Sequence, residues 1–294
     1  MSTANIRTVG VIGVGQMGRG ICQIFTQSGY SVIAIDHSET ALAYACEFVE
    51  KALLRDCEKG NCTHTDVSAA MAGLTWSQNL TDIANCDLVI ESATENEETK
   101  IKIFEALQPH LRAHTILATN TSSLSVTRLA ACTDRPERFI GLHFMNPVPK
   151  MNLVEIIRGL ATQDGIYNTL NDVVTSLGKT STTSQDFPAF IVNRILIPMI
   201  NEAIYVLFEG VGTVASIDTS MKLGANHPMG PLQLADFIGL DTCLAIMNVL
   251  YDGFGDPKYR PCPLLVQYVG AGWLGRKKGR GFYNYSQSLP VPSK

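Results

Sequence analysis

Three glycines near the N-terminus constrain this chain more than any other feature. Gly13, Gly15 and Gly18 have the spacing G-x-G-x-x-G. They follow the β-branched run Thr8–Ile12, and a helical pattern begins near Gln16. The first glycine permits the tight turn, the second lets a pyrophosphate approach the backbone, and the third lets the helix pack against the strand. The pattern therefore predicts a strand, turn and helix that bind dinucleotide phosphates at the helix N-terminus.

An acidic residue at the end of the second expected strand favours NAD over NADP. Asp36 lies 21 residues after Gly15 and directly after the strand-like run Ser31–Ile35. A carboxylate there accepts hydrogen bonds from the adenosine ribose and repels a 2′-phosphate. We expect Gln16 and Met17, at the start of the helix, to complete the cofactor site. The competing interpretation is a structural turn followed by a solvated Asp36.

The first half of the chain alternates strand and helix patterns, which favours parallel strands joined by right-handed crossovers. We therefore expect an α/β fold with a Rossmann-type doubly wound parallel sheet. The expected strands are Thr8–Ile12, Ser31–Ile35, Asp87–Ile90, Thr115–Ala118, Phe139–Leu142, Leu153–Ile157 and Lys179–Thr183, and the expected helices are Met17–Gln27, Ala41–Lys59, Glu97–Leu111 and Ile166–Leu177.

The pattern changes near residue 187. From Ile191 onward apolar residues recur at helical spacing, and strand-like alternation largely stops until the motif GRGFYNY. We therefore expect a nucleotide-binding domain over residues 1–187 and a smaller all-helical domain over 188–294. The stretch Ile191–Phe208 is apolar around much of its circumference, which favours a homodimer formed through the helical domain. The tail SQSLPVPSK after Tyr285 is expected to be frayed.

Charge and composition exclude several classes of protein. The chain has 23 Lys and Arg against 27 Asp and Glu, so the basic excess of a nucleic-acid-binding protein is absent. No signal peptide is recognisable at the N-terminus, and charged or polar residues interrupt the most apolar stretch, Phe187–Phe208. The eight cysteines include no C-x-x-C pair. We expect a cytoplasmic protein with free thiols, no membrane association and no metal.

Two segments carry candidate catalytic groups. His143 follows an expected strand, and Glu155 lies twelve residues later in another. Together they suggest a general base whose imidazole is held in one tautomer by a carboxylate. Ser122, Ser123 and Ser125 also follow a strand, where serines commonly cap the next helix.

Several longer motifs resemble one family. NTSSL, GLHFMNPVP and LVEII occur in order with DFPAFIVNRILIPMINEA (Asp186–Ala203) and MKLGANHPMGPLQLADFIGLDT (Met221–Thr242). These motifs are similar to those of the short-chain L-3-hydroxyacyl-CoA dehydrogenases, including 3-hydroxybutyryl-CoA dehydrogenases. The resemblance runs from about Ile6 to Tyr285 without large insertions. One departure is NPVPKMNLVE, where the family commonly has NPVPVMKLVE, so Lys150 and Asn152 differ from its pattern.

The resemblance implies roles for particular residues. His143 would remove the hydroxyl proton as hydride leaves C3 for the nicotinamide, and Glu155 would orient it. Ser122 and Asn193 match the groups that bind the C3 oxygen and the thioester region. Three further residues resemble those that line the nicotinamide half of the NAD site in this family: Glu95, Lys100 and Asn120.

The resemblance also places coenzyme A contacts on the long helix before Gly60. Lys51, Arg55 and Lys59 have the spacing i, i+4, i+8, so they share one helix face. That face is either a phosphate-binding stripe or an ordinary solvated surface.

The leading hypothesis is an oxidoreductase that uses NAD to oxidise short-chain L-3-hydroxyacyl-CoA to 3-ketoacyl-CoA, and catalyses the reverse, in fatty-acid or butyrate metabolism. One alternative is a dehydrogenase of a free 3-hydroxy acid. Another is a non-enzymatic crystallin-like or NAD-sensing protein of the same fold. Ser122, His143, Glu155 and Asn193 together argue against the last, because a protein without catalysis has no chemical reason to keep all four.

Overall fold

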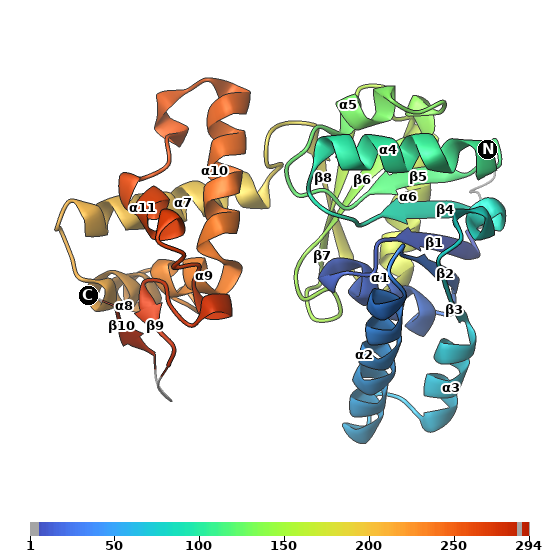
Figure 1. The fold of residues 1–294 in the computed structure, drawn as a ribbon, viewed down its shortest axis with the longest axis horizontal. Coiled ribbons are helices and arrows are strands. Elements are labelled where there is room, and N and C mark those ends of the chain that lie inside the picture. Colours follow the sequence, from blue (N-terminus) through green and yellow to red (C-terminus); the bar gives the residue numbers. More distant parts are fainter. Residues whose placement is uncertain (1–5, 287–289, 294) are drawn as a thin grey trace. The chain divides into compact units, whose positions relative to one another are not determined.

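The computed structural model describes residues 6–286 and 290–293. The chain divides into two compact units, Met1–Phe187 and Pro188–Lys294. The first unit is an α/β domain and the second is mainly helical (Figure 1).

The first unit is built on an eight-stranded sheet with the order β3-β2-β1-β4-β5-β6-β7-β8. Neighbouring strands are parallel except β6 and β7, which run antiparallel. This confirms the doubly wound sheet, with β1 and β4 side by side where the strand order reverses. The strands are β1 (Thr8–Ile12), β2 (Ser31–Ile35), β3 (Leu74–Ser77), β4 (Leu88–Glu91), β5 (Ile116–Thr119), β6 (Phe139–Phe144), β7 (Leu153–Arg158) and β8 (Thr180–Gln185).

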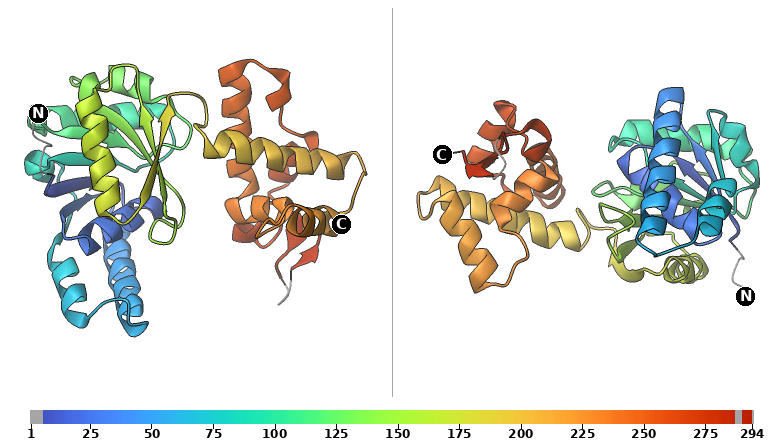
Figure 2. Two further views of the ribbon diagram at one scale, coloured as in Figure 1. Left: turned by 180° about the vertical axis from the view of Figure 1, so that it is seen from behind. Right: turned by 90° about the horizontal axis from the view of Figure 1, so that it is seen from below.

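Helices cover both faces of this sheet, as the ribbon seen from behind and from below makes clear (Figure 2). One core joins α1, α2, α3 and α6 to alternate strand residues such as Val9, Val11, Leu88 and Ile90. Helices α4 and α5 lie on the other face, and each buries part of its side chains. The helices are α1 (Gln16–Gln27), α2 (Glu39–Glu58), α3 (His64–Ala72), α4 (Glu97–Leu107), α5 (Val126–Ala131) and α6 (Asp164–Ser176).

Strand β3 and helix α3 of this unit were not predicted from the sequence. Strand β3 lies at the sheet edge and buries only Leu74 fully, so it lacks the alternation that marks a strand. Helix α3 is short and has a weak apolar face, although Thr63 and Asp66 form a capping box at its start. The expected helix Glu97–Leu111 ends early, because Pro109 lies in a separate 3₁₀ turn.

The second unit packs five helices around its own core. Buried members of that core include Ile200, Leu232 and Met247. The carboxylate of Asp218 accepts hydrogen bonds from the backbone N–H groups that begin α9. The helices are α7 (Val192–Phe208), α8 (Val214–Gly224), α9 (Pro231–Ile238), α10 (Leu240–Phe254) and α11 (Pro263–Gly270).

A short antiparallel ribbon closes the second unit. It pairs β9 (Tyr283–Asn284) with β10 (Val291–Pro292), so the expectation of a wholly frayed tail is wrong for residues 290–293. Backbone pairing and a hydrogen bond from Ser293 N–H to the Phe282 carbonyl hold this segment. Residues 287–289 and 294 lie outside the described part. Among the described residues no single helix has the length and apolarity to cross a membrane, while α9 and α10, which meet at 97°, pass that test only as a bent pair.

Candidate active site

The glycine-rich turn joins β1 to α1 and leaves room for an anion. Gly15 is the N-cap of α1 and has no side chain to cap the N–H groups of the first helical turn. A Cβ built at Gly15 would meet no atom within 4 Å. The open space and the helix N-terminus together fit a pyrophosphate.

The other two glycines are required by the protein itself. Gly13 has a φ of 87°, and a Cβ there would lie 2.9 Å from the Ala93 backbone. A Cβ at Gly18 would lie 1.8 Å from the carbonyl oxygen of Gly13, so only glycine lets α1 approach the turn this closely. Met17 is half-buried in the same turn.

Asp36 also supports this turn. Its Oδ2 accepts a hydrogen bond from Val14 N–H at 3.0 Å, and its Oδ1 accepts one from Ser38 N–H at 3.0 Å. Its position at the carboxyl end of β2 suits contact with the adenosine ribose. The side-chain amide of Gln16 donates to Asn146 Oδ1 at 3.1 Å.

His143 and Glu155 are paired directly across the antiparallel strands β6 and β7. His143 Nδ1 lies 2.8 Å from Glu155 Oε2. The His143 side chain is 8% exposed and that of Glu155 is fully buried, so the pair sits in a largely water-free setting. A carboxylate here accepts the Nδ1 proton and leaves the Nε2 lone pair of the neutral ring as the base.

Ser122 is held by Glu95. Glu95 Oε1 accepts hydrogen bonds from Thr121 Oγ1, from the N–H and hydroxyl of Ser122, and from the same two groups of Ser123, at 2.7–3.1 Å. Burial raises the pKa of Glu95, but the Lys100 ammonium and these hydrogen bonds outweigh it and hold that pKa below its usual value. The expected N-cap role falls to Ser125 alone, whose hydroxyl accepts from Arg128 N–H.

Asn120 connects the ends of three neighbouring strands. Its N–H donates to the Glu91 carbonyl of β4, and its side-chain oxygen accepts from Phe144 N–H in β6 at 3.0 Å. Since Phe144 follows His143, this contact fixes the strand end that carries the imidazole. Asn120 itself follows β5.

Comparisons with known proteins identify the family of this chain. Residues 8–187 match the family model "3-hydroxyacyl-CoA dehydrogenase, NAD binding domain", and residues 190–285 match the C-terminal domain of the same family. The chain belongs to the 3-hydroxyacyl-CoA dehydrogenase family. It is an NAD-dependent enzyme.

Similar proteins cover almost the whole chain. A 3-hydroxybutyryl-CoA dehydrogenase of Bradyrhizobium diazoefficiens is 57% identical over 99% of both chains. One from Clostridioides difficile is 44% identical over 94% of this chain and 99% of its own. The crystal structure of the (S)-3-hydroxybutyryl-CoA dehydrogenase PaaH1 from Ralstonia eutropha has a TM-score of 0.94 and 49% identity, covering 96% of this chain and 100% of that one.

The remaining expected residues lie on two helices. Asn193 is in the first turn of α7, in the second unit. Lys51, Arg55 and Lys59 are exposed at the far end of α2, and Lys51 pairs with Glu47.

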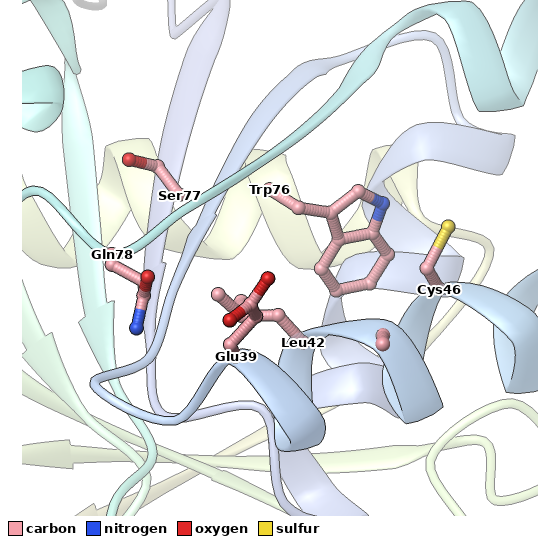
Figure 3. Close-up of a pocket in the computed structure, with 7 residues that line it drawn as sticks. Glu39, Leu42, Cys46, Trp76, Ser77 and Gln78 are labelled. Carbon is pink, nitrogen blue, oxygen red and sulfur yellow. The ribbon is translucent and has the colours of Figure 1, made fainter.

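A surface hollow of about 410 Å³ lies between α2 and β3, next to the expected ribose site (Figure 3). Asp36 adjoins it, because its N–H donates to the Ser77 carbonyl. The hollow contains none of the predicted catalytic residues. Its lining is Glu39, Leu42, Ala43, Cys46, Trp76, Ser77 and Gln78.

Sequence reasoning missed one buried residue beside the site. Glu91, the last residue of β4, is fully buried and pairs with Lys100 at 2.7 Å. Its only sequence signal was a carboxylate at the end of an apolar run. Among the described residues no cluster of three or more His, Cys, Asp or Glu side chains is arranged to hold a metal ion.

Proposed function

We propose that this dehydrogenase interconverts short-chain L-3-hydroxyacyl-CoA and 3-ketoacyl-CoA, with 3-hydroxybutyryl-CoA as its preferred class of substrate. The buried pair of His143 and Glu155 carries this proposal, because alcohol oxidation needs a base at the carboxyl edge of the NAD-binding sheet. The high identity to 3-hydroxybutyryl-CoA dehydrogenases supports the choice of a four-carbon acyl group.

The chain's residues divide the chemistry between them. NAD⁺, which the glycine-rich turn and Asp36 would hold, would supply the hydride acceptor for C3 of the substrate. His143 Nε2 accepts the hydroxyl proton, and Glu155 stabilises the imidazolium that forms. Ser122 and Asn193 bind the C3 oxygen and the thioester region, where they favour the charge that develops on oxygen.

The cofactor is held by the turn and by the strand ends. The first-turn N–H groups at Gln16 and Met17 would hold the pyrophosphate, and Asp36 would bind the adenosine ribose. Glu95, Lys100 and Asn120 shape the nicotinamide end.

The remaining contacts concern the rest of the substrate and a second subunit. Lys51, Arg55 and Lys59 bind the phosphates of coenzyme A. Exposed apolar side chains of the helical unit, among them Ile195 and Leu223, support a homodimer through that unit. The site of action is the cytoplasm.

A direct test measures loss of NADH absorbance with acetoacetyl-CoA, with longer 3-ketoacyl-CoA esters, with an ω-carboxylated ester and with free acetoacetate. The proposal expects the highest kcat/KM for acetoacetyl-CoA. Preference for free acetoacetate would establish the free-acid alternative. Preference for a long or carboxylated ester would assign a different acyl class.

A further inference from the structure

A buried ion pair lies beside the proposed active site and takes no direct part in its chemistry. Lys100 Nζ lies 2.7 Å from Glu91 Oε1 and 2.8 Å from Oε2, and the lysine is 1% exposed. The carboxylate also accepts from Ala93 N–H and from Thr119 Oγ1, both at 2.7 Å. Each oxygen of Glu91 therefore receives two hydrogen bonds.

Such a pair is poorly explained by stability alone. Transferring two charges from water costs several kcal/mol per ion, and apolar replacements are often as stable. Both partners come from elements that end or begin at the carboxyl edge of the sheet, next to the loops that follow β4 and β5. The location suggests that the pair organises those loops.

The contacts of Lys100 show how the ion pair reaches the loop that contains Ser122. Besides Glu91, its Nζ faces Glu95 Oε2 at 3.7 Å. The other oxygen of Glu95 binds Thr121, Ser122 and Ser123. An unbroken series of charged and hydrogen-bonded groups thus leads from Glu91 through Lys100 and Glu95 to Ser122.

We propose that Glu91 is a positioning residue, which fixes the Lys100 ammonium so that it holds Glu95 and, through it, the backbone and hydroxyl of Ser122. The role of Ser122 in this inference rests on the proposed function. Glu91 itself touches neither substrate nor cofactor in this scheme.

The substitution Glu91→Gln removes the negative charge of Glu91 and nearly keeps the shape of its side chain. The fixed N–H of Ala93 requires the amide oxygen at its side, which places the amide NH₂ toward Thr119 and Lys100. Thr119 can rotate its hydroxyl, but the ammonium cannot accept a hydrogen bond. Lys100 therefore shifts toward Glu95, and the loop with Ser122 moves.

The experiment compares Glu91→Gln with the double variant Glu91→Gln/Lys100→Met, in which no buried charge is left without its partner. The control is Arg135→Met. Arg135 is another buried cation, but it donates to the Arg112 carbonyl just before β5, at the opposite edge of the sheet. Three quantities are measured, namely Tm, kcat with acetoacetyl-CoA, and hydrogen exchange of the Ser122 and Ser123 amides.

We expect Glu91→Gln to lower Tm, to lower kcat by about 10- to 100-fold and to speed exchange of both amides, because small displacements at a reacting centre have effects of that size. The double variant should regain Tm yet keep the low kcat and the fast exchange. Arg135→Met should lower Tm alone.

Several results would overturn the proposal. A double variant that regains turnover and amide protection along with Tm would make the pair purely structural. The pair would also be purely structural if Glu91→Gln kept wild-type kcat and wild-type protection of the amides from exchange. The same conclusion would follow if Arg135→Met lost as much kcat and amide protection as Glu91→Gln. If the wild type reduces no 3-ketoacyl-CoA, the proposed function fails, and amide exchange still decides the role of Glu91.

Discussion

His143 and Glu155 stand opposite one another in the single antiparallel pairing of the described eight-stranded sheet, with Nδ1 and Oε2 2.8 Å apart. Because strand register places the two residues opposite one another, the carboxylate and the imidazole stay within reach of each other while the strands are paired. The pair therefore holds one tautomer before substrate arrives.

His143→Gln should lower kcat by about 10²- to 10⁴-fold, because the base that accepts the hydroxyl proton is lost. Its affinity for NADH should stay near the wild-type value. Steady-state kinetics and NADH fluorescence titration measure the two quantities. An equal loss of cofactor affinity would give His143 a structural role instead.

Glu155→Gln should lower kcat at least about tenfold, since a neutral amide can present its NH₂ to Nδ1 and lacks the charge that stabilises the imidazolium. The buried amide should keep the strands paired, so circular dichroism should be unchanged. Wild-type turnover would remove Glu155 from the mechanism.

Gly15→Ala and Gly18→Ala should have different effects, because the first should weaken NADH binding and the second should destabilise the fold. At Gly15 a Cβ meets nothing and φ is -60°, so stability should change by less than about 0.5 kcal/mol while the Kd for NADH rises about tenfold or more. At Gly18 the clash with Gly13 should cost about 2 to 3 kcal/mol despite the better helix propensity of alanine. Urea unfolding and NADH titration measure both effects. Unchanged NADH affinity in Gly15→Ala would remove the pyrophosphate from this turn.

Asp36→Ala should weaken NAD binding by about 10- to 100-fold, because it removes charged hydrogen bonds to the ribose and to Val14 N–H. Asp36→Asn provides the matched control, since it keeps an acceptor but no charge. Both variants should bind NADP relatively better than the wild type does. A wild-type preference for NADPH would contradict the assignment of Asp36.

Arg55→Ala should raise the KM for acetoacetyl-CoA about two- to fivefold and spare kcat, because an exposed phosphate contact far from C3 contributes uniform binding. The increase should shrink at higher ionic strength. Lys102→Ala, an exposed lysine of α4, is the control and should leave KM unchanged. If a truncated thioester without the nucleotide suffers equally, Arg55 supports the helix rather than the ligand.

Asp236 should make the stability of the helical unit depend on pH. Burial raises the pKa of its carboxyl to about 6, although Tyr283 and Phe282 N–H groups and the Tyr285 hydroxyl bind it. The folded state therefore holds the proton more tightly than the unfolded one. The resulting stability is complete below about pH 4 and is lost as pH rises through 6, a change of about 3 kcal/mol.

Trp273 fluorescence in a Trp76→Phe background follows unfolding of this unit alone, since these are the two tryptophans of the chain. Asp236→Asn should flatten the pH dependence between pH 5 and 7, whatever its effect on absolute stability. If stability changed equally with pH in both proteins, the Asp236 carboxyl would not titrate between pH 5 and 7.

Local patterns in the sequence determined the parts of the fold that depend on neighbouring residues. The spacing of Gly13, Gly15 and Gly18 reflects steric limits within one turn, and alternating apolar residues follow from the pleat of each buried strand. These short-range rules located the turn, Asp36 and seven of the eight strands of the main sheet. The same rules failed at β3, because an edge strand that buries little apolar surface leaves no periodic signal.

Tertiary structure alone decided how the site is assembled. Glu95 and Ser122 are 27 residues apart, yet one carboxylate oxygen organises the whole loop, because β4 and β5 end side by side. The same adjacency buries Glu91 and places Thr119 on its carboxylate. Strand order and register bring these groups together, and both are set by packing over the entire sheet rather than by any local stretch of sequence.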